Sequence, residues 1–506
     1  MTSVPSIDPR TGETTGIVAE ETTPEQVDRI CSAALAAAGP LEELGRAARA
    51  SLLDDLAGAL ETNRERIVEV ADRETALGAG RLHGELTRTC YQLRLFGEVL
   101  RDGGYLEATI DHAGDTPMGP RPDLRRMLVP IGPVAVFGAS NFPLAFSVPG
   151  GDTASALAAG SPVVLKAHHS HPATSQLCYE IMAGAARRSG APDGTLGIVH
   201  GLEAGAGLVA HPAIRAVGFT GSPGGAKALL AIIEKRPEPI PFYGELSSLN
   251  PVVVTPAAAA DRGERIGADF AASFTLGAGQ FCTKPGLLLV PAGPDGDRVV
   301  TAVQEAISGL EPMTMLNAGI AAAYQQGTDA LRAALTASPA DGSLPSGGTS
   351  RPGRAAPYVF LATAGDLPPE ATGECFGPVT VIARWADEAE LFAAVDELPS
   401  SLTATVHRGP GETVLPAELA RRFRPHTGRL VFDGYPTGVA VSWAQHHGGP
   451  WPATNSQHTS VGTSAIRRFL RPVTWQNAPA DLLPPELRDE YDSLPRRVDG
   501  VFHPKI

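Results

Sequence analysis

The chain has 506 residues, which is too long for one hydrophobic core, so roughly two or three domains are expected. With 43% hydrophobic and 19% charged residues, its composition is that of an ordinary soluble globular protein. Its formal net charge of -14 excludes a general nucleic-acid binder, and no apolar run is long enough to span a bilayer.

The first part of the chain is predicted to be helical. Apolar residues recur at three- and four-residue spacing through residues 24–77, and a further helix is expected over 81–102. From Leu124 the pattern changes to extended segments, which Gly132 and Pro133 separate. The polar N-terminal stretch lacks a basic segment followed by an apolar one, so we expect no secretory signal.

Strands and helices then alternate. Between residues 134 and 235 each short apolar strand is followed by a helical stretch. A second α/β region begins at Asn250 and ends near Gly438, and within it a Ser-, Gly- and Pro-rich stretch at 338–357 indicates a surface loop or insertion. This alternation predicts an α/β fold whose parallel sheets are covered by helices on both faces.

One of the five cysteines lies in an unusual context. The five are scattered, odd in number and free of CxxC pairs, so they indicate neither a disulfide framework nor a zinc knuckle, and we expect a reduced, cytoplasmic enzyme. Glycines flank Cys282 in the window 276–286, where they let the backbone approach a ligand closely. A thiol needs surroundings that favour the thiolate before it attacks a carbonyl well. An isolated cysteine is otherwise more often an inert core residue.

Two further polar residues, Glu245 and Asn141, occur in contexts that suit a catalytic role. Glu245 follows Gly244 and precedes a short polar turn and an apolar strand, although a random loop glutamate is usually just solvated. Asn141 ends a strand shortly before Pro143. Its amide can donate to a developing oxyanion. Its alternative, purely structural role would be that of a turn residue.

A series of short motifs joins these windows into one pattern. In chain order they are Asn141-Phe-Pro, Leu165-Lys166, Gly218-Phe-Thr-Gly-Ser222, Gly-Glu245-Leu, Gly-Gln-Phe-Cys282 and Glu374-Cys-Phe-Gly-Pro378. In order and spacing they resemble the aldehyde dehydrogenase superfamily over essentially the whole chain. The resemblance implies an α/β fold with two doubly wound parallel-sheet domains and a small β oligomerisation element.

The resemblance also implies roles for the three polar residues. Cys282 would form a thiohemiacetal with an aldehyde, and Asn141 with the Cys282 backbone N–H would hold the oxyanion. Glu245 would activate water to hydrolyse the resulting thioester. Because all three residues are present in their expected contexts, a non-catalytic binding protein on this fold is disfavoured. The retained Glu245 favours hydrolysis over transfer of the acyl group to CoA.

A nicotinamide dinucleotide is the implied coenzyme. By resemblance Lys166 holds the adenosine ribose, Gly221 and Ser222 receive the pyrophosphate at a helix start, and Glu374 and Phe376 lie at the nicotinamide ribose.

One departure from the family pattern bears on the choice between NADP and NAD. NAD-preferring relatives carry a glutamate where this sequence has His169. A carboxylate repels a 2′-phosphate, whereas an imidazole can donate to it, so we expect NADP, with NAD as a second coenzyme. Alternatively, His168, His169 and His171 are solvated polar residues near a turn and bind no ligand. We expect no metal site from them, because neighbouring ligands at a strand end point apart.

The substrate is predicted from a closer resemblance. The stretches 88–96, 137–146 and 448–454 are similar to the branch of 2,5-dioxopentanoate (α-ketoglutaric semialdehyde) dehydrogenases. A neighbouring branch oxidises fatty aldehydes with NADP. An acidic semialdehyde needs a cation for its carboxylate, usually a bidentate arginine, whereas a long alkyl aldehyde needs an apolar tunnel.

Arg88 is our predicted carboxylate clamp. It shares a helix face with Gln92, and the resemblance places this helix at the substrate entrance. A surface or interdomain salt bridge is the alternative role. Aromatic residues that suit either substrate are expected to line the rest of the pocket: Phe142, Phe146, Phe274 and Phe281.

The domain boundaries are also implied by resemblance. We expect a coenzyme-binding domain over 1–244, a catalytic cysteine domain over 245–440, and a C-terminal segment over 441–506 that returns to the first domain. An arm at 122–137 and a C-terminal strand would extend a neighbour's sheet, so a homodimer or homotetramer is expected.

Overall fold

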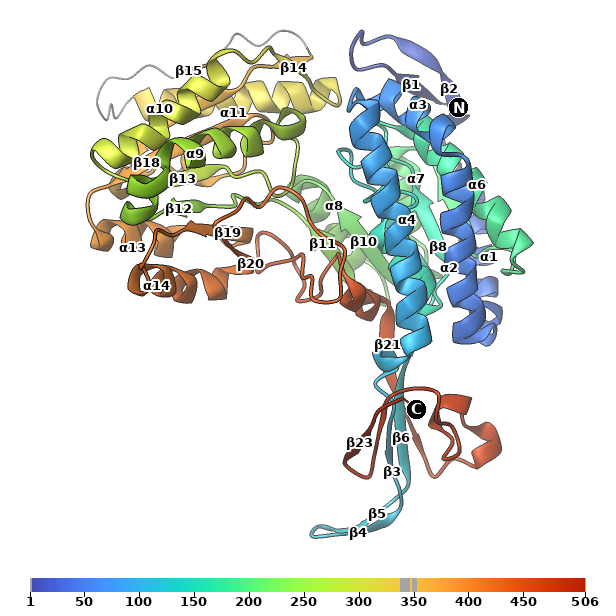
Figure 1. Ribbon diagram of the computed structural model, residues 1–506. Coiled ribbons are helices and arrows are strands. Elements are labelled where there is room, and N and C mark those ends of the chain that lie inside the picture. The colour runs from blue at the N-terminus through green and yellow to red at the C-terminus, as the bar shows by residue number, and fades with distance from the viewer. Residues whose placement is uncertain (1, 337–345, 348–352, 506) are drawn as a thin grey trace.

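The computed structural model describes residues 2–336, 346–347 and 353–505. Two α/β lobes stand side by side, and a small β extension projects from the first of them (Figure 1). Within the described residues, every helix is too short or too polar to cross a membrane.

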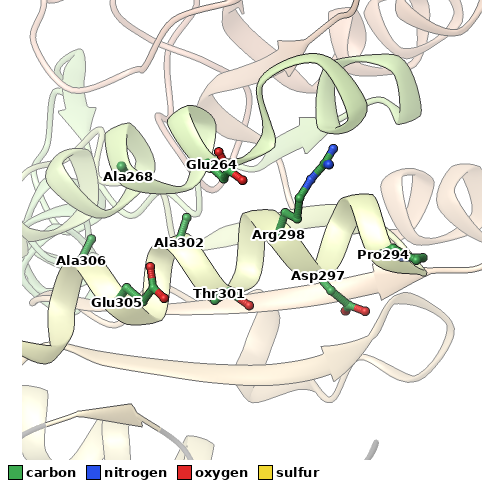
Figure 2. Close-up of a pocket in the computed structure, with 9 residues that line it drawn as sticks. All are labelled: Glu264, Ala268, Pro294, Asp297, Arg298, Thr301, Ala302, Glu305 and Ala306. Atoms are coloured by element: carbon green, nitrogen blue, oxygen red, sulfur yellow. The ribbon is translucent and has the colours of Figure 1, made fainter.

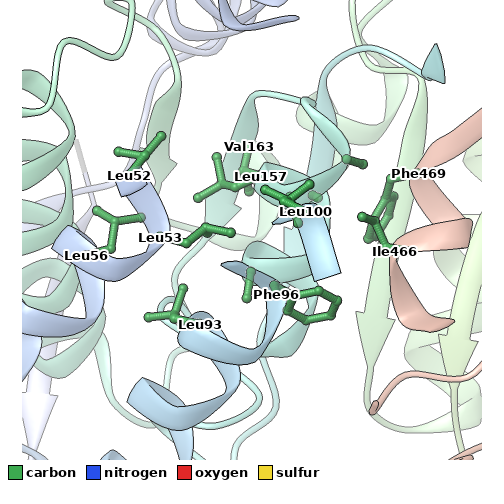
Figure 3. Packing of buried hydrophobic residues seen from close by; sticks show 14 of the residues in the cluster. Leu52, Leu53, Leu56, Leu93, Phe96, Leu100, Leu157, Val163, Ile466 and Phe469 are labelled. Atoms are coloured by element: carbon green, nitrogen blue, oxygen red, sulfur yellow. The ribbon is translucent and has the colours of Figure 1, made fainter. Parts of the chain in front are cut away.

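The N-terminal region is helical, as predicted for residues 24–77 and 81–102. A hairpin of β1 (Ser3–Ile7) and β2 (Thr14–Glu20) precedes the helices. The helices are α1 (Pro24–Glu43), α2 (Gly45–Thr62), α3 (Arg64–Thr75) and α4 (Ala79–Asp102). Thr23 caps the start of helix α1, and its side chain accepts from the Gln26 backbone N–H in a reciprocal capping box. The apolar faces of these helices pack onto the first sheet and its helices (Figure 3).

The first sheet has five parallel strands in the order β11-β10-β7-β8-β9. Its strands are β7 (Val134–Phe137), β8 (Val163–Lys166), β9 (Leu196–Val199), β10 (Ala216–Thr220) and β11 (Phe242–Glu245). Its helices are α5 (Gly151–Ala159), α6 (Pro172–Arg188), α7 (Leu202–Ala210) and α8 (Pro223–Glu234). The predicted alternation over residues 134–235 is confirmed. It brings the segments after β7, β8 and β10 together at the carboxyl edge of the sheet.

The second sheet has seven strands in the order β15-β17-β18-β13-β12-β19-β20, parallel except for β15. Its strands are β12 (Val252–Val254), β13 (Leu287–Pro291), β15 (Ser346–Gly347), β17 (Tyr358–Thr363), β18 (Val379–Trp385), β19 (Ser401–His407) and β20 (Thr427–Phe432). Its helices are α9 (Pro256–Thr275), α10 (Pro294–Ser308), α11 (Ala318–Thr336), α12 (Pro369–Thr372), α13 (Glu388–Glu397) and α14 (Val414–Phe423). The predicted α/β class with two parallel-sheet domains is thus confirmed.

The loop predicted over 338–357 lies largely outside the described residues. Of its described part, Arg354–Ala355 forms the short strand β16, which pairs with β14 (Met313–Thr314).

A third sheet forms the projecting extension, with strand order β21-β6-β3-β22-β23. Its strands are β3 (Thr109–Asp111), β6 (Leu124–Pro130), β21 (Leu470–Gln476), β22 (Arg496–Val498) and β23 (Val501–His503), with the hairpin β4 (Gly114–Thr116) and β5 (Gly119–Arg121) beyond them. The arm expected over 122–137 is therefore divided: β6 pairs with β21, but β7 is central in the first sheet. Gly132 has a φ of 108° and Pro133 cannot donate to a ladder, so the chain leaves one sheet and enters the other there.

The boundary expected between residues 244 and 245 also differs in detail. Strand β11 continues through Glu245 as part of the first sheet, and Glu245 forms an isolated bridge with Thr454. The C-terminal segment contributes Ile466 and Phe469 to the core of the first domain (Figure 3).

Candidate active site

The loop that carries Cys282 is fixed by unusual backbone and by hydrogen bonds. It follows the short 3-10 segment η2 (Leu276–Gly279), where Gly277, Ala278 and Gly279 all have positive φ. A Cβ on Gly279 would lie 2.2 Å from the Gly377 carbonyl oxygen, so only glycine fits. The buried Asn250 side chain donates to the carbonyl of Cys282 over 2.8 Å. The thiol is thereby held in one place just before β13.

A thiol, an imidazole and a carboxylate converge at this loop. The Cys282 Sγ lies 3.6 Å from the His447 Nε2, which donates to the Glu245 Oε1 over 2.8 Å. The other Glu245 oxygen accepts from the Ser460 hydroxyl over 2.7 Å. His447 and Glu245 are 2% and 3% exposed. Such an array suits proton transfer to and from the thiol.

The acid–base properties of this group follow from its burial. Burial raises the pKa of the Cys282 thiol well above its usual range, and the charge and hydrogen bonding of Glu245 raise it further. Burial also raises the pKa of Glu245, but the charge and hydrogen bond of His447 and the bond from Ser460 outweigh it and lower that pKa. Both shifts favour a protonated thiol beside an ionised carboxylate in the free enzyme.

Asn141 lies directly opposite the thiol loop. Its Nδ2 donates to the Gln280 carbonyl over 2.9 Å, and the residue is 7% exposed. The structure therefore brings the three sequence-predicted polar residues together: Asn141 from the segment after β7, Glu245 from the end of β11, and Cys282 from the second domain.

Helix α4 holds the segment that carries Asn141. Arg81 Nη2 donates to the Asn141 carbonyl over 2.6 Å, and its guanidinium lies 4.9 Å and 4.7 Å from the ring centroids of Phe142 and Phe281. One turn along the helix, the buried Glu85 accepts from the backbone N–H groups of Leu144 and Ala145, each over 2.8 Å. Arg81 thus contacts both the backbone of Asn141 and the ring of Phe281, the residue before Cys282.

Cys282 also lines a cavity of about 420 Å³. Of the predicted coenzyme residues, His169, Gly221, Ser222, Glu374 and Phe376 line it, together with Asn141 and Cys282. Burial raises the pKa of Glu374 to about 7, although hydrogen bonding by Ser247 opposes the shift. The second domain closes this cavity with the start of α11, where Asn317 Nδ2 donates to the Ser170 hydroxyl over 2.7 Å.

One end of the cavity offers a place for a phosphate group. Ser222 caps α8 by accepting from the Gly225 N–H over 3.2 Å, and a helix start of this kind binds phosphate. Lys166 does not line the cavity; its stem lies against Gly205 near the end of β8. Burial lowers the pKa of Lys166, and the charge of Glu21 opposes that shift.

The three neighbouring histidines are stacked, and their exposure increases from the buried His171 through His168 to His169. The His168 ring lies 4.3 Å from that of His169 and 5.3 Å from that of His171. His171 is fully buried, with its Nε2 2.9 Å from the Ala139 carbonyl oxygen. Burial, and next the charge of Lys166, lower the pKa of His169. Only His168 and His169 of the three line the cavity.

Aromatic side chains beside the thiol loop pack against one another and form what we call the aromatic wall. Phe142 is 5.3 Å from Phe146 and 5.2 Å from Phe281, measured between ring centroids, and Phe146 is 6.2 Å from His447. The Arg88 guanidinium lies 5.0 Å from the Phe146 centroid, and its Nε donates to the Val439 carbonyl over 3.3 Å.

Two predicted substrate residues lie elsewhere. Phe274 is fully buried and packs against Phe270 in the core of the second domain, 5.6 Å between centroids, so the structure does not bring it to the wall. Gln92 is 2% exposed, and its amide lies against Gly151 at the start of α5.

The surface has a larger hollow of about 950 Å³ between α9 and α10 (Figure 2). Its lining offers no thiol or imidazole, and Arg298 there is paired with Asp295 over 2.9 Å. The chemistry therefore belongs to the smaller cavity at Cys282.

Comparison with known proteins identifies the family. The profile of the aldehyde dehydrogenase family matches residues 1–434. This chain is an aldehyde dehydrogenase. It is 43% identical to an alpha-ketoglutaric semialdehyde dehydrogenase of Acinetobacter baylyi over 507 positions, covering 99% of this chain and 96% of that protein. It is 45% identical to alpha-ketoglutaric semialdehyde dehydrogenase 2 of Azospirillum brasilense, covering 94% of this chain and 91% of that one.

The fold of the enzyme agrees with this membership. Aldehyde dehydrogenase 21 from Physcomitrella patens superimposes with a TM-score of 0.79 at 19% identity, covering 94% of this chain and 95% of the other. The dehydrogenase therefore oxidises an aldehyde with a nicotinamide dinucleotide.

Sequence reasoning missed several residues of this dehydrogenase site. His447 directly precedes the stretch 448–454 that resembles related enzymes, so the signal was adjacent. Arg81 and Ser460 carry no motif of their own, because their role depends on which distant segments they meet in space.

Proposed function

We propose that this aldehyde dehydrogenase oxidises 2,5-dioxopentanoate to 2-oxoglutarate with NADP. The observation that carries the substrate class is the Arg88 guanidinium. Both of its terminal nitrogens are buried and find no hydrogen-bond partner among the described residues. A buried cation without a partner is costly, and a substrate carboxylate would satisfy it. The names of the two bacterial relatives support the same substrate.

A second arginine approaches from the other side of the same loop. Arg429, on β20, donates to the carbonyls of Pro436 over 2.6 Å and Gly438 over 3.2 Å, next to the Val439 carbonyl that Arg88 holds. Burial lowers the pKa of both guanidiniums, and the charge of Cys282 is among the influences that oppose it. Two cations within electrostatic reach of the thiol suit a short substrate with an acidic far end.

The proposed chemistry starts at the thiol. Glu245, with His447, takes the proton of Cys282 as the sulfur attacks the aldehyde carbon. The Asn141 amide and the Cys282 backbone N–H hold the oxyanion of the thiohemiacetal. The bound coenzyme supplies the acceptor for the hydride that leaves this carbon. Glu245 passes the thiol proton to solvent and then removes a proton from water, whose oxygen attacks the thioester. The carboxylic acid leaves as the sulfur takes this second proton back from Glu245 and becomes a thiol again.

NADP is favoured by the composition of the cavity. His169 lies at its wall near Lys166, and neither residue repels a 2′-phosphate as a carboxylate would.

The free edge of β21 supports a homodimer or homotetramer, since a strand edge can extend a neighbour's sheet. All five cysteines are unpaired, which agrees with our placement of the enzyme in the cytoplasm.

The test is the ratio of kcat/KM for 2,5-dioxopentanoate to that for decanal, with NADP and then with NAD. A ratio well above one is expected, and Arg88→Met should raise KM for the acidic substrate by about tenfold or more while sparing decanal. Arg94→Met is the matched control, because Arg94 lies on the same helix but pairs with Glu61. A ratio well below one would assign the enzyme to fatty aldehydes, for which the aromatic wall would serve, and would reject the Arg88 clamp.

A further inference from the structure

The three side chains at the centre of the site also have the geometry of a metal site. The Cys282 Sγ, the His447 Nε2 and a Glu245 carboxylate oxygen all lie within 4.8 Å of one another. In residues 2–336, 346–347 and 353–505, this is the one group of three or more cysteine, histidine or acidic side chains that converges so closely. Thiolate, imidazole and carboxylate are the ligands that zinc takes in proteins.

We propose that this triad binds a thiophilic divalent cation, Zn²⁺ above all, and that the cation reversibly inhibits the enzyme. The cation would be an inhibitor and not a cofactor, because it occupies the nucleophile and the base at once. The proposal does not depend on which aldehyde is the substrate.

One ligand distance already fits tetrahedral coordination, and a second needs to lengthen. Bonds of about 2.3 Å to sulfur and about 2.0–2.1 Å to nitrogen place the two ligand atoms roughly 3.6 Å apart. The Cys282 Sγ and the His447 Nε2 are 3.6 Å apart already. The His447 Nε2 and the Glu245 Oε1, now 2.8 Å apart, would need to separate to roughly 3.4 Å. Three protein ligands leave the fourth position for water.

The charges and protons also balance. The Glu245 carboxylate and a Cys282 thiolate together carry the two negative charges that neutralise the cation. Binding replaces the thiol proton, which goes to solvent, and moves the imidazole proton from Nε2 to Nδ1, so that Nε2 can bind the metal. In the buried site, the negative charge of Glu245 disfavours the thiolate form of Cys282. A bound dication would favour the thiolate instead.

The access route predicts a second property. Cys282 lines the cavity assigned to the coenzyme, together with Asn141 and Glu374. A cation entering from that side must pass through the space that the coenzyme fills. Bound NADP should therefore slow the loading of the metal.

The test is a titration of the full-length apoenzyme with Co²⁺, followed by the charge-transfer absorption that sulfur ligation produces. We expect a saturable band that Zn²⁺ abolishes by competition. Cys282→Ser should lose the band, and His447→Asn should weaken Co²⁺ binding about tenfold or more. Cys375→Ser is the matched control and should bind as the wild type does, since Cys375 lies outside the triad. Chelation with EDTA should restore the activity of the zinc-inhibited wild type.

Two outcomes would overturn the proposal. One is a band that persists in Cys282→Ser, and the other is wild-type affinity in both His447→Asn and Glu245→Gln. Thermal unfolding of each variant shows whether it is folded, and two different ligand substitutions keep the test valid if one is not. Because the titration contains no aldehyde, its failure would leave the proposed oxidation untouched.

Discussion

The two sides of Cys282 are built in different ways. The proposed coenzyme side is the carboxyl edge of a parallel sheet, where turns after β8 and β10 place His169, Gly221 and Ser222 around the cavity. The proposed substrate side is made of side chains from α4 and from two loops, with Arg81 and Arg88 lying on aromatic rings. The first depends on backbone that the fold dictates, and the second on individual side chains. Substitutions on the two sides should therefore have separable effects.

Substitutions at the centre, between the two sides, should lower kcat the most. Glu245→Gln and His447→Asn should each lower kcat by about 10²–10⁴-fold, because each removes a member of the proton-transfer array. Since the two side chains share a hydrogen bond, the double variant should lose much less than the product of the single losses. Steady-state rates measure this, with coenzyme affinity as the control. Independent, multiplicative losses would show that the two residues do not act together.

Helix α4 should be next in effect. Arg81→Met removes the donor to the Asn141 carbonyl, so kcat should fall by about 10²-fold with little change in KM, approaching the loss of roughly 10²–10³-fold expected for Asn141→Ala. Arg81→Lys should retain part of the activity. The control Arg94→Met should show none of the loss. In an Asn141→Ala background, Arg81→Met should add little. A full additional loss there would mean that Arg81 acts through overall stability and not through Asn141.

The pH dependence of alkylation tests the electrostatics of the thiol. Burial and Glu245 raise the pKa of Cys282, so inactivation of the free enzyme by iodoacetamide should still be accelerating above about pH 8.5, where an ordinary thiol titrates. Removal of the negative charge in Glu245→Gln favours the thiolate and should move the midpoint to lower pH. An unchanged midpoint would contradict the close approach of the two groups.

The coenzyme side should show the smallest effect. His169→Glu introduces a carboxylate at the cavity wall, which should shift the ratio of kcat/KM for NADP to that for NAD toward NAD by roughly tenfold, about the free energy of one charged hydrogen bond. The turnover of the aldehyde at saturating coenzyme should be unchanged. A preserved NADP preference would place the 2′-phosphate elsewhere.

The sequence predicts the coenzyme side better than the substrate side for a physical reason. Alternating strands and helices bring the ends of β7, β8 and β10 to one edge whatever the loops contain, so local motifs suffice to place Asn141 and Ser222. Phe274 was expected to line the substrate pocket, but its helical position turns it into the core beside Phe270. His447 was missed because its partner Glu245 lies on a strand far away in the chain. Contacts of that range depend on tertiary packing, which periodicity does not report.

The three central side chains come from different parts of the chain, so the geometry of the site depends on how the two domains are aligned. Glu245 ends a strand of the first sheet, Cys282 precedes a strand of the second, and His447 belongs to the C-terminal segment. A displacement of one domain against the other by an ångström or two would separate sulfur from imidazole while leaving every helix and strand intact. In mild denaturant, activity should then disappear before circular dichroism changes, so enzyme assays would detect loosening between the domains that spectroscopy of secondary structure does not.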